Sequence, residues 1–258
     1  MTLMLDVSSN NHPNGTTFDY AAAKESGYEW VYVKATQGDY YTNPYALGDL
    51  KGFKDAGFRV GVYHYFDATI NVVGQAQYFE RELAKIISAS GVMPTLVRAL
   101  DYEQGEPSAE VVAEFGRASS EPSVTYMDRS FAQAIGPPKG WPIWLAWPGY
   151  STARGISGLV GYGTVAAVQC RQPTVPGIGV ADVSTVVDPA AFSVPDTKPA
   201  PVADAGAPGS YTSLHNWWWT RVPSTPTELP LYKEQYVRLP NGSTLTVVRI
   251  APGVVSYL

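Results

Sequence analysis

Short apolar runs alternate with amphipathic stretches along the first half of the chain. Runs rich in β-branched and aromatic residues predict strands, whereas apolar residues at helical spacing, such as Ala76, Phe79, Leu83 and Ile86, predict an amphipathic helix. We expect strands at residues 3–7, 30–34, 59–66, 93–103 and 124–127, and helices at 18–23, 44–56, 73–87 and 108–118. Strands that alternate with helices predict a parallel sheet covered by helices.

The pattern weakens after residue 128. A short helix at 131–135 and strands at 143–146 and 165–168 are expected, but the segments between them are rich in glycine and too short for regular helices. Roughly eight strands with good helices only in the first half predict an α/β fold, an irregular (β/α) barrel of the TIM type.

The composition changes at residue 193. Pro, Ala, Asp and Gly dominate residues 193–210, which predicts an extended linker after a barrel domain of residues 1–192. Beyond it, residues 236–239 and 244–250 flank Pro240-Asn241-Gly242-Ser243, a sequence typical of a β-hairpin turn. We therefore expect residues 211–258 to form a small β module with a binding or docking role.

Charge and cysteine content narrow the class of protein. The net charge of -5 and the absence of a Lys/Arg run disfavour a nucleic-acid partner. The single cysteine, Cys170, cannot form an internal disulfide, and we interpret it as a small buried apolar residue. No apolar run reaches the roughly 20 residues that span a membrane, and the first residues do not resemble a secretory signal.

Carboxylates stand where several predicted strands end. Asp101 and Glu103 are two residues apart at the end of an apolar run, so on a strand both would face the barrel axis, at the end where barrel enzymes carry their sites. Asp6 ends the first strand, and Asp188 follows the apolar pair at 186–187. We expect the four acids to converge, and like charges so close would raise the proton affinity of one of them.

Several short motifs, in a fixed order, resemble the glycoside hydrolase family 25 muramidases. The resemblance covers residues 5 to about 192, roughly three quarters of the chain, and implies the family's barrel fold. In this chain Gln37 replaces the more common Glu, and Cys170 stands where an aromatic residue usually follows Gln169. The matching segments are Asp6-Val7-Ser8-Ser9, residues 30–38 and 60–65, Asp101-Tyr102-Glu103, Trp144-Leu145-Ala146, Val168-Gln169 and residues 187–192.

The resemblance implies hydrolysis, with retention, of the β-1,4 bond between N-acetylmuramic acid and N-acetylglucosamine in bacterial peptidoglycan. Glu103 would be the general acid and base, Asp101 would act on the developing charge or on the 2-acetamido group, and Asp6 and Asp188 would give electrostatic support. Whether a carboxylate or the acetamido group is the nucleophile stays open. Neither a cofactor nor a metal is expected.

Aromatic side chains are the second requirement of a glycan site, because sugar rings stack their C–H faces on Trp and Tyr. Tyr63, Tyr65, Tyr126, Trp144 and Trp147 lie near predicted strand ends and are candidates for such contacts. Lys34 of the second-strand motif joins this substrate-binding set. For any one aromatic, packing in the core is an equal alternative, and for His64 a hydrogen-bonded core position is favoured over catalysis.

The expected setting is that of a bacteriophage endolysin, held in the host cytoplasm until it is released to the cell wall. A rival hypothesis is a structural protein of the virion or wall, in which the barrel binds glycan or assembles and residues 211–258 dock to a virion or wall partner. A chitinase is disfavoured, because the further acid of that class, two residues before Asp101, is Ala99 here.

Three weaker signals remain. Residues 161–166 match a dinucleotide fingerprint but precede a predicted strand instead of following one, which argues against cofactor binding. His12, His64 and His215 are isolated and give no metal-binding spacing. Trp217-Trp218-Trp219 predict either a binding face or a hydrophobic plug, with equal weight.

Overall fold

A computed structural model describes residues 2–119, 124–135, 141–151, 159 and 161–194, and the backbone of five strands between residues 211 and 257. The chain divides into two compact units, Met1–Val194 and Pro195–Leu258. Within the described residues, no helix is long and apolar enough to cross a membrane.

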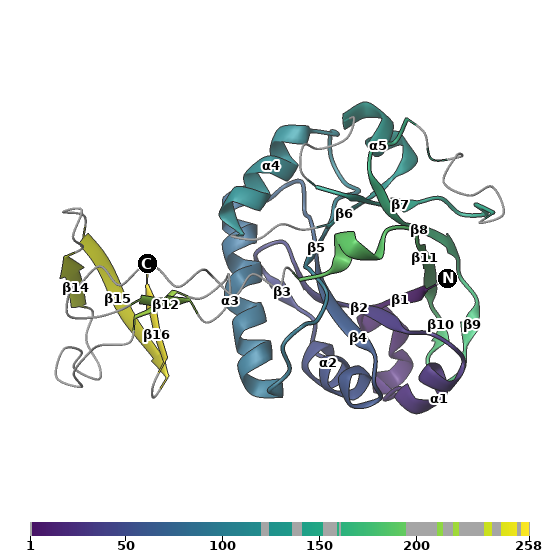
Figure 1. The fold of residues 1–258 in the computed structure, drawn as a ribbon, viewed down its shortest axis with the longest axis horizontal. Helices are drawn as coiled ribbons and strands as arrows, with labels where there is room; N and C mark the ends of the chain where they lie inside the picture. The colour runs from purple at the N-terminus through teal and green to yellow at the C-terminus, as the bar shows by residue number, and fades with distance from the viewer. Residues whose placement is uncertain are drawn as a thin grey trace. The chain divides into compact units, whose positions relative to one another are not determined.

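The first unit is a closed barrel of eight strands, drawn as a ring in Figure 1. Neighbouring strands from β1 to β8 run parallel, whereas β11 is antiparallel to both β8 and β1 and completes the ring. Around the ring the strands are β1 (Leu3–Val7), β2 (Trp30–Gln37), β4 (Arg59–Tyr65), β5 (Ala99–Asp101), β6 (Val124–Asp128), β7 (Ile143–Ala146), β8 (Val165–Arg171) and β11 (Asp182–Val186). The short strand β3 (Tyr41–Thr42) extends β2, and β9 (Thr174–Val175) pairs with β10 (Gly179–Val180).

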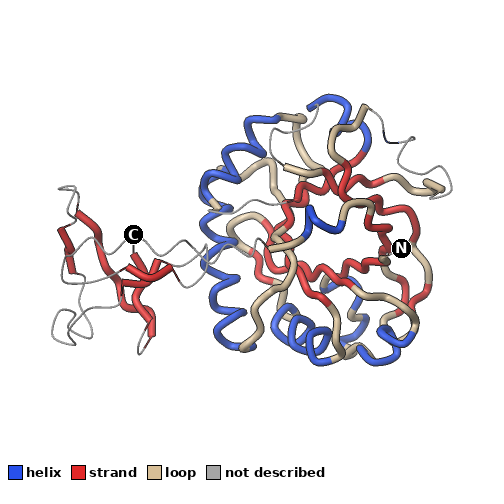
Figure 2. The backbone as a smooth tube through the Cα atoms, in the orientation of Figure 1, coloured by secondary structure: helices blue, strands red, loops and turns tan. Residues whose placement is uncertain are grey.

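The α-helices lie outside the ring of strands, as Figure 2 shows. The described α-helices are α1 (Tyr20–Glu25), α2 (Ala46–Asp55), α3 (Val72–Ser90), α4 (Ala109–Ala118) and α5 (Arg129–Ile135). Side-chain caps begin several of them: Asp19 accepts from the N–H of Ala22, Asn71 from that of Gly74, and Ser108 from that of Val111. Helix α3 presents the predicted apolar stripe, with Ala76, Phe79, Leu83 and Ile86 buried.

The barrel interior is filled by large side chains, so it is a packed core. A short 3₁₀ helix, η5 (Pro189–Phe192), lies across the centre of the ring in Figures 1 and 2. Its Phe192 is fully buried and packs edge-on against Trp30 and Tyr32. The Tyr32 hydroxyl donates to the carbonyl oxygen of Val97 (2.7 Å), which satisfies the one polar atom of that ring inside the core.

Most predicted elements are confirmed, with one clear error. The expected strand at 93–103 is reduced to Ala99–Asp101. The preceding segment bonds elsewhere, because the N–H groups of Thr95 and Leu96 both donate to Val60 and that of Val97 donates to Phe192. An apolar segment that closes one end of a barrel has the same composition as a buried strand. The apolar pattern of residues 93–103 therefore could not distinguish a closing segment from a strand.

Cys170, His64 and residues 161–164 lie where the sequence predicts them. Cys170 is buried and free, and residues 161–164 do precede strand β8. His64 is a buried core residue that bonds Thr36 and Gln75 through its two ring nitrogens. The burial of Cys170, the position of residues 161–164 before a strand and the core position of His64 are as predicted.

The second unit contains β12 (Tyr211–Ser213), β13 (Trp219–Arg221), β14 (Gln235–Arg238), β15 (Thr244–Ala251) and β16 (Val254–Tyr257). Strands β12 and β13 pair antiparallel, and β14, β15 and β16 form a second antiparallel sheet. The expected pairing of 236–239 with 244–250 is present, with Arg238 opposite Thr244. The predicted turn at 240–243, the linker from 195 on, Trp217 and Trp218 lie outside the described residues.

Candidate active site

A pocket of about 220 Å³ opens where the parallel strands of the barrel end. Polar and aromatic side chains from every strand of the ring reach it, which is the end at which barrel folds carry their sites. Its lining comprises Asp6, Val7, Ser8, Asn10, Asn11, Lys34, Tyr63, Tyr65, Asp101, Glu103, Tyr126, Trp144, Gln169 and Asp182.

Four carboxylates meet in this pocket. Asp6 lies near the end of β1 and Asp101 ends β5, as predicted, while Glu103 lies two residues beyond the strand and is exposed at the pocket. The fourth is Asp182, which the sequence analysis missed. Asp182 begins β11 and stands directly opposite Asp6 in the antiparallel β1–β11 pair.

Asp188, the predicted fourth acid, is not part of the pocket. Its carboxylate caps η5 by accepting from the N–H of Ala190 (3.0 Å), and its own N–H donates to Ala166, near the start of β8. Because β11 runs antiparallel, its first residue lies with the ends of the parallel strands and its last residue lies with their beginnings. The prediction for Asp188 was wrong because it assumed a parallel last strand, which would have reversed these positions.

Burial and neighbouring charges raise the pKa of Asp6 to about 7. Loss of hydration is the largest cause, and the charges of Asp182 and Glu103 add to it, whereas a hydrogen bond from Gln169 opposes it. The amide of Gln169 donates to Oδ2 of Asp6 (3.2 Å) and accepts from the hydroxyl of Tyr126 (2.9 Å). Gln169 therefore holds Asp6 in place, and the protonation of Asp6 depends on the charges of Asp182 and Glu103.

Asp101 and Glu103 both have raised pKa values. Burial is the main cause for Asp101, followed by the charges of Glu103 and Asp6, while Lys34 acts against the rise. Its Oδ1 is buried and has no hydrogen-bond partner. For Glu103, partial burial in the pocket raises the pKa, a hydrogen bond with Tyr65 lowers it, and the charge of Asp128 raises it. A carboxyl whose pKa is raised above its ordinary value and that faces an open pocket is suited to general acid catalysis.

Lys34 is the cation of the pocket lining. Burial lowers its pKa, and the charges of Asp101 and Glu103 oppose that change. Its Nζ donates to Oε1 of Gln37 (2.8 Å) and lies 4.3 Å from the ring centre of Tyr65. Because Gln37 is neutral, it does not compensate the positive charge of Lys34, which interacts instead with Asp101 and Glu103.

The loop after β1 forms one wall of the pocket. It contains the 3₁₀ helices η1 (Ser9–Asn11) and η2 (Pro13–Gly15), and Ser8 and Asn11 cap the first of them reciprocally. Asn11 also donates to the carbonyl of Val180 (2.9 Å). Sequence reasoning did not single out Ser8, Asn10 or Asn11, although the Asp6-Val7-Ser8-Ser9 motif leads directly into them.

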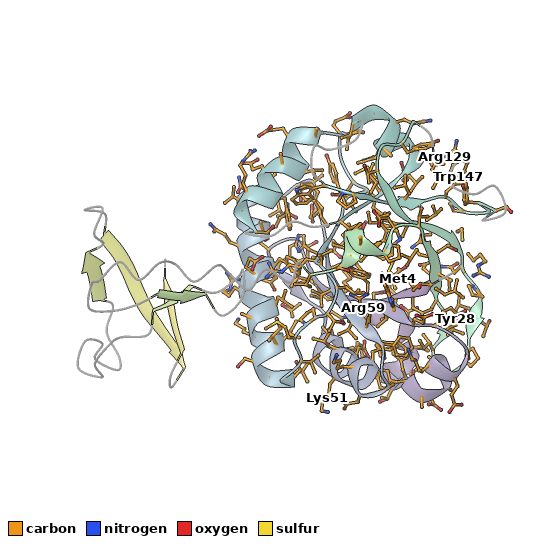
Figure 3. All side chains as sticks on the ribbon, viewed as in Figure 1. Met4, Tyr28, Lys51, Arg59, Arg129 and Trp147 are labelled. Atoms are coloured by element: carbon orange, nitrogen blue, oxygen red, sulfur yellow. The ribbon has the colours of Figure 1, made fainter. Side chains whose placement is uncertain are left out.

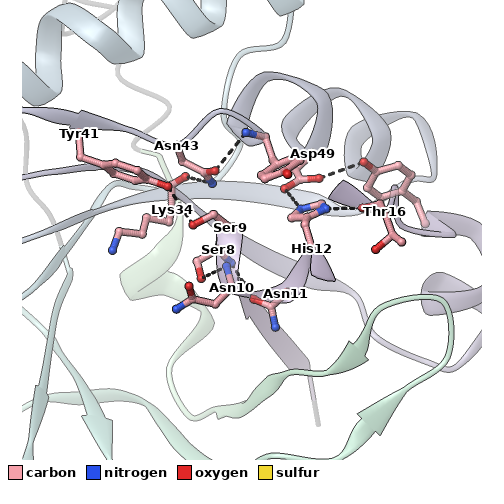
Figure 4. A network of polar contacts seen from close by, with 12 residues as sticks. Ser8, Ser9, Asn10, Asn11, His12, Thr16, Lys34, Tyr41, Asn43 and Asp49 are labelled. Atoms are coloured by element: carbon pink, nitrogen blue, oxygen red, sulfur yellow. Dashed lines mark hydrogen bonds and ion pairs between the residues drawn. The ribbon is translucent and has the colours of Figure 1, made fainter. Parts of the chain in front are cut away.

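His12 anchors that loop to Asp49 of α2, and Figure 4 shows this contact. Its Nδ1 lies 2.7 Å from the carbonyl oxygen of Thr16 and its Nε2 lies 2.8 Å from Oδ2 of Asp49. The ring is stacked between Phe18 and Tyr45, with both ring centres 4.0 Å away. A carbonyl oxygen only accepts, so Nδ1 donates to Thr16, and Nε2 faces the buried carboxylate of Asp49.

Four of the five predicted aromatics reach the pocket, namely Tyr63, Tyr65, Tyr126 and Trp144. Trp144 is almost fully buried and donates through Nε1 to the hydroxyl of Ser184 (2.8 Å), so its role includes core packing. The fifth, Trp147, is not part of the pocket lining. It packs against Tyr150 and Tyr162 and lies beneath the guanidinium of Arg129, 4.1 Å from its ring centre, as Figure 3 illustrates.

Gln169 and Asp182 line the pocket, but little in the sequence marks them as site residues. Gln169 belongs to a matched motif, but nothing in its spacing assigned it a hydrogen bond with Asp6. Asp182 precedes a run at 183–187 that is rich in β-branched residues, and it could have been found only by allowing the last strand to run antiparallel.

Comparisons with known proteins bear on this arrangement. The model of the family described as glycosyl hydrolases family 25 matches residues 5–152. An autolytic lysozyme of Clostridium acetobutylicum is 43% identical over 61 residues, which are 24% of this chain and 18% of that protein. The chain thus matches less than a fifth of the length of this relative.

Solved structures show the same fold. The catalytic domain of endolysin ply40, from bacteriophage P40 of Listeria monocytogenes, has a TM-score of 0.60 at 21% identity, covering 72% of this chain and 93% of that one. The CTP1L endolysin has a TM-score of 0.59 at 23% identity, covering 73% and 67%. A bacterial lysozyme from Streptomyces coelicolor has a TM-score of 0.56 at 19% identity, covering 72% and 91%.

Proposed function

The chain belongs to glycosyl hydrolase family 25, and from this we propose that its barrel is a lysozyme that hydrolyses bacterial peptidoglycan. The observation that carries the proposal is the meeting of Asp6, Asp101, Glu103 and Asp182 in one open pocket. Cleavage of a glycosidic bond needs a proton donor for the leaving oxygen and negative charge beside the cationic sugar carbon, and this pocket can supply both.

Glu103 is the proposed general acid. Its carboxyl faces the pocket, and the pKa raised by partial burial and by Asp128 keeps it protonated to higher pH than an ordinary glutamate. It would protonate the departing oxygen and, once ionised, take a proton from the attacking water.

The other three acids have proposed roles in charge stabilisation. Asp101 lines the pocket and would stabilise the developing charge or orient the 2-acetamido group of the substrate. Asp6 and Asp182 face each other across β1 and β11 and would favour the positive charge that develops on the sugar. Tyr63, Tyr65, Tyr126 and Trp144 would contact the sugar rings, with Lys34 close to Glu103 and Asp101.

The finer proposal is that the bond cut is the β-1,4 linkage from N-acetylmuramic acid to N-acetylglucosamine. We also propose that the protein serves as a bacteriophage endolysin, with the second unit as a binding or docking module. Support for the phage setting comes from the fold shared with the CTP1L and ply40 endolysins.

The test is digestion of purified peptidoglycan with mass analysis of the new reducing ends. The expected products end in muramic acid, whereas ends in glucosamine would overturn the proposed specificity. In the same assay Glu103→Gln is expected to lower turnover by at least about 1,000-fold with its circular dichroism spectrum unchanged.

A matched control is Glu106→Gln, since Glu106 is exposed three residues further along the same loop and is not part of the pocket lining. This variant is expected to retain wild-type turnover. Substantial turnover by Glu103→Gln would refute the assignment of the general acid.

A further inference from the structure

Tyr40 is an exposed tyrosine that is nevertheless fixed in place. It occupies the tight turn between β2 and β3, and 58% of its surface is exposed. Its hydroxyl donates to Oδ2 of Asp67 (2.9 Å) and accepts from Nε2 of Gln37 (3.1 Å). An exposed tyrosine side chain ordinarily samples several rotamers. Here two hydrogen bonds, to residues of different elements, hold the Tyr40 ring in one orientation.

The Cδ1–Cε1 edge of the Tyr40 ring lies close to the backbone of Gly38. A Cβ atom built on Gly38 would come within 2.5 Å of Cε1 and 2.9 Å of Cδ1 of the ring. Gly38 also has φ of 53°, a left-handed conformation that favours glycine. The turn therefore needs glycine for two reasons, and the Tyr40 ring lies against its backbone while more than half of the residue stays exposed to solvent.

The anchor of the hydroxyl is itself rigid. Asp67 accepts from both the N–H (2.9 Å) and the hydroxyl (2.7 Å) of Thr69, and these bonds together with that of Tyr40 lower the pKa of its carboxyl. Asp67 is thus ionised over the whole neutral range, and its bond from Tyr40 is charge-assisted.

Tyr40 is joined to the wall of the pocket through Gln37. The amide that donates to Tyr40 accepts from Nζ of Lys34, a pocket residue, so one amide group separates the two. Gln37 also pairs in register with Tyr65, another pocket residue, across β2 and β4. Tyr40 therefore stands on the rim beside Lys34 and Tyr65.

We propose that Tyr40 is a separate subsite that stacks against one further sugar ring of the glycan strand, beyond the two rings joined by the bond that is cut. Sugar rings present C–H faces that pack on aromatic rings, and a preorganised platform loses little entropy on binding. Asp67 and Gln37, at the edge of the ring, can bond the hydroxyls of that sugar. The subsite rests on the proposed function, because only a strand lying in the pocket reaches this rim.

The test uses glycan strands from which the peptide stems have been removed, in a short form that spans only the bond cut and in a long form. Tyr40→Ala is expected to raise KM about 5- to 10-fold for long strands and to leave kcat unchanged, with short strands unaffected. Tyr40→Phe keeps the ring and is expected to raise KM less than about 3-fold. Leu47→Ala is the control, since Leu47 is 40% exposed on α2 and is not part of the pocket lining.

Binding gives a readout that does not depend on hydrolysis. Long strands are titrated into Glu103→Gln protein with and without Tyr40→Ala, and the second change is expected to weaken Kd by the same factor. An unchanged Kd, or an equal loss for short and long strands, would overturn the subsite, as would an effect seen only with stem peptides present. Absence of turnover in the wild type with the Tyr40-dependent binding intact would instead refute the proposed function alone.

Discussion

Asp6 and Asp182 stand opposite each other in the antiparallel pair of β1 and β11, and both residues line the pocket. The charge of Asp182 is, after burial, the largest cause of the raised pKa of Asp6. This pair completes the set of acids that the sequence motifs only partly indicated.

We expect Asp182→Asn to lower turnover by about 100-fold or more, because it removes one of the negative charges facing the developing cation. The matched variant is Asp188→Asn, which keeps the cap of η5, since asparagine caps helices as well as aspartate does. Asp188→Asn is expected to be as active and as stable as the wild type. Steady-state hydrolysis of peptidoglycan by both variants decides between the two positions, and the reverse ranking would contradict the structural assignment.

The stability of the protein should depend on Asp6 between about pH 4 and pH 7. Its pKa is about 7 in the fold against an ordinary value of 3.8, so the folded state binds the proton more tightly than the unfolded chain does. That contribution is fully present below pH 4 and is lost as the pH rises through 7, a change of at most about 4 kcal/mol.

Asp6→Asn is therefore expected to unfold at a higher temperature than the wild type at pH 8 and to lose this advantage near pH 4, as measured by calorimetry. Asp39→Asn, at an exposed aspartate, serves as the control and should leave the pH dependence unchanged. Equal effects of Asp6→Asn at both pH values would show that Asp6 is not buried in its charged state.

Asp128 is expected to set the alkaline limit of activity. Its pKa is lowered by hydrogen bonds from Ser130 and Phe131, so it stays ionised and raises the pKa of Glu103. Asp128→Asn removes this charge and should move the descending limb of the pH–rate profile to lower pH, because Glu103 then loses its proton sooner. Asp55→Asn makes the same change in net charge at an exposed position and should not move the limb. A limb that moves equally in both variants would indicate an effect of net charge.

The buried pair of His12 and Asp49 is expected to stabilise the loop that forms the pocket wall. His12→Ala would leave Asp49 buried with only the hydroxyl of Tyr20 as a donor, and we expect a loss of about 3 kcal/mol in the free energy of unfolding. Lys51→Ala, which breaks the exposed pair with Asp55, is expected to cost less than about 0.5 kcal/mol. Urea unfolding of both variants measures the difference, and similar losses would show that burial gives the His12 pair no special weight.

Sequence patterns predicted the elements that depend on local spacing. The apolar stripe of α3 and the acids Asp6 and Asp101 near strand ends follow from periods of 3.6 and two residues. Glu103 was placed in the pocket by the same spacing, although it lies beyond the strand.

The errors concern features that spacing does not encode. Trp147 follows β7 closely, as a pocket residue would, but its ring is held by Arg129, Tyr150 and Tyr162. The run at 93–98 is as apolar as a strand but closes the barrel against η5. In each case at least one partner, such as Arg129 for Trp147 and Phe192 for the run at 93–98, is distant in sequence, and nothing local identifies it.

The sequence by itself determined that this chain forms alternating strands and helices, that acids stand at strand ends, and that its motifs match family 25. Only the tertiary structure decided which acids meet, because the direction of β11 is set by its hydrogen bonds to β1 and β8 and not by its own residues. The apolar pattern of a strand is the same for either direction in the sheet. The direction nevertheless decides whether Asp182 or Asp188 lies at the pocket end of the barrel.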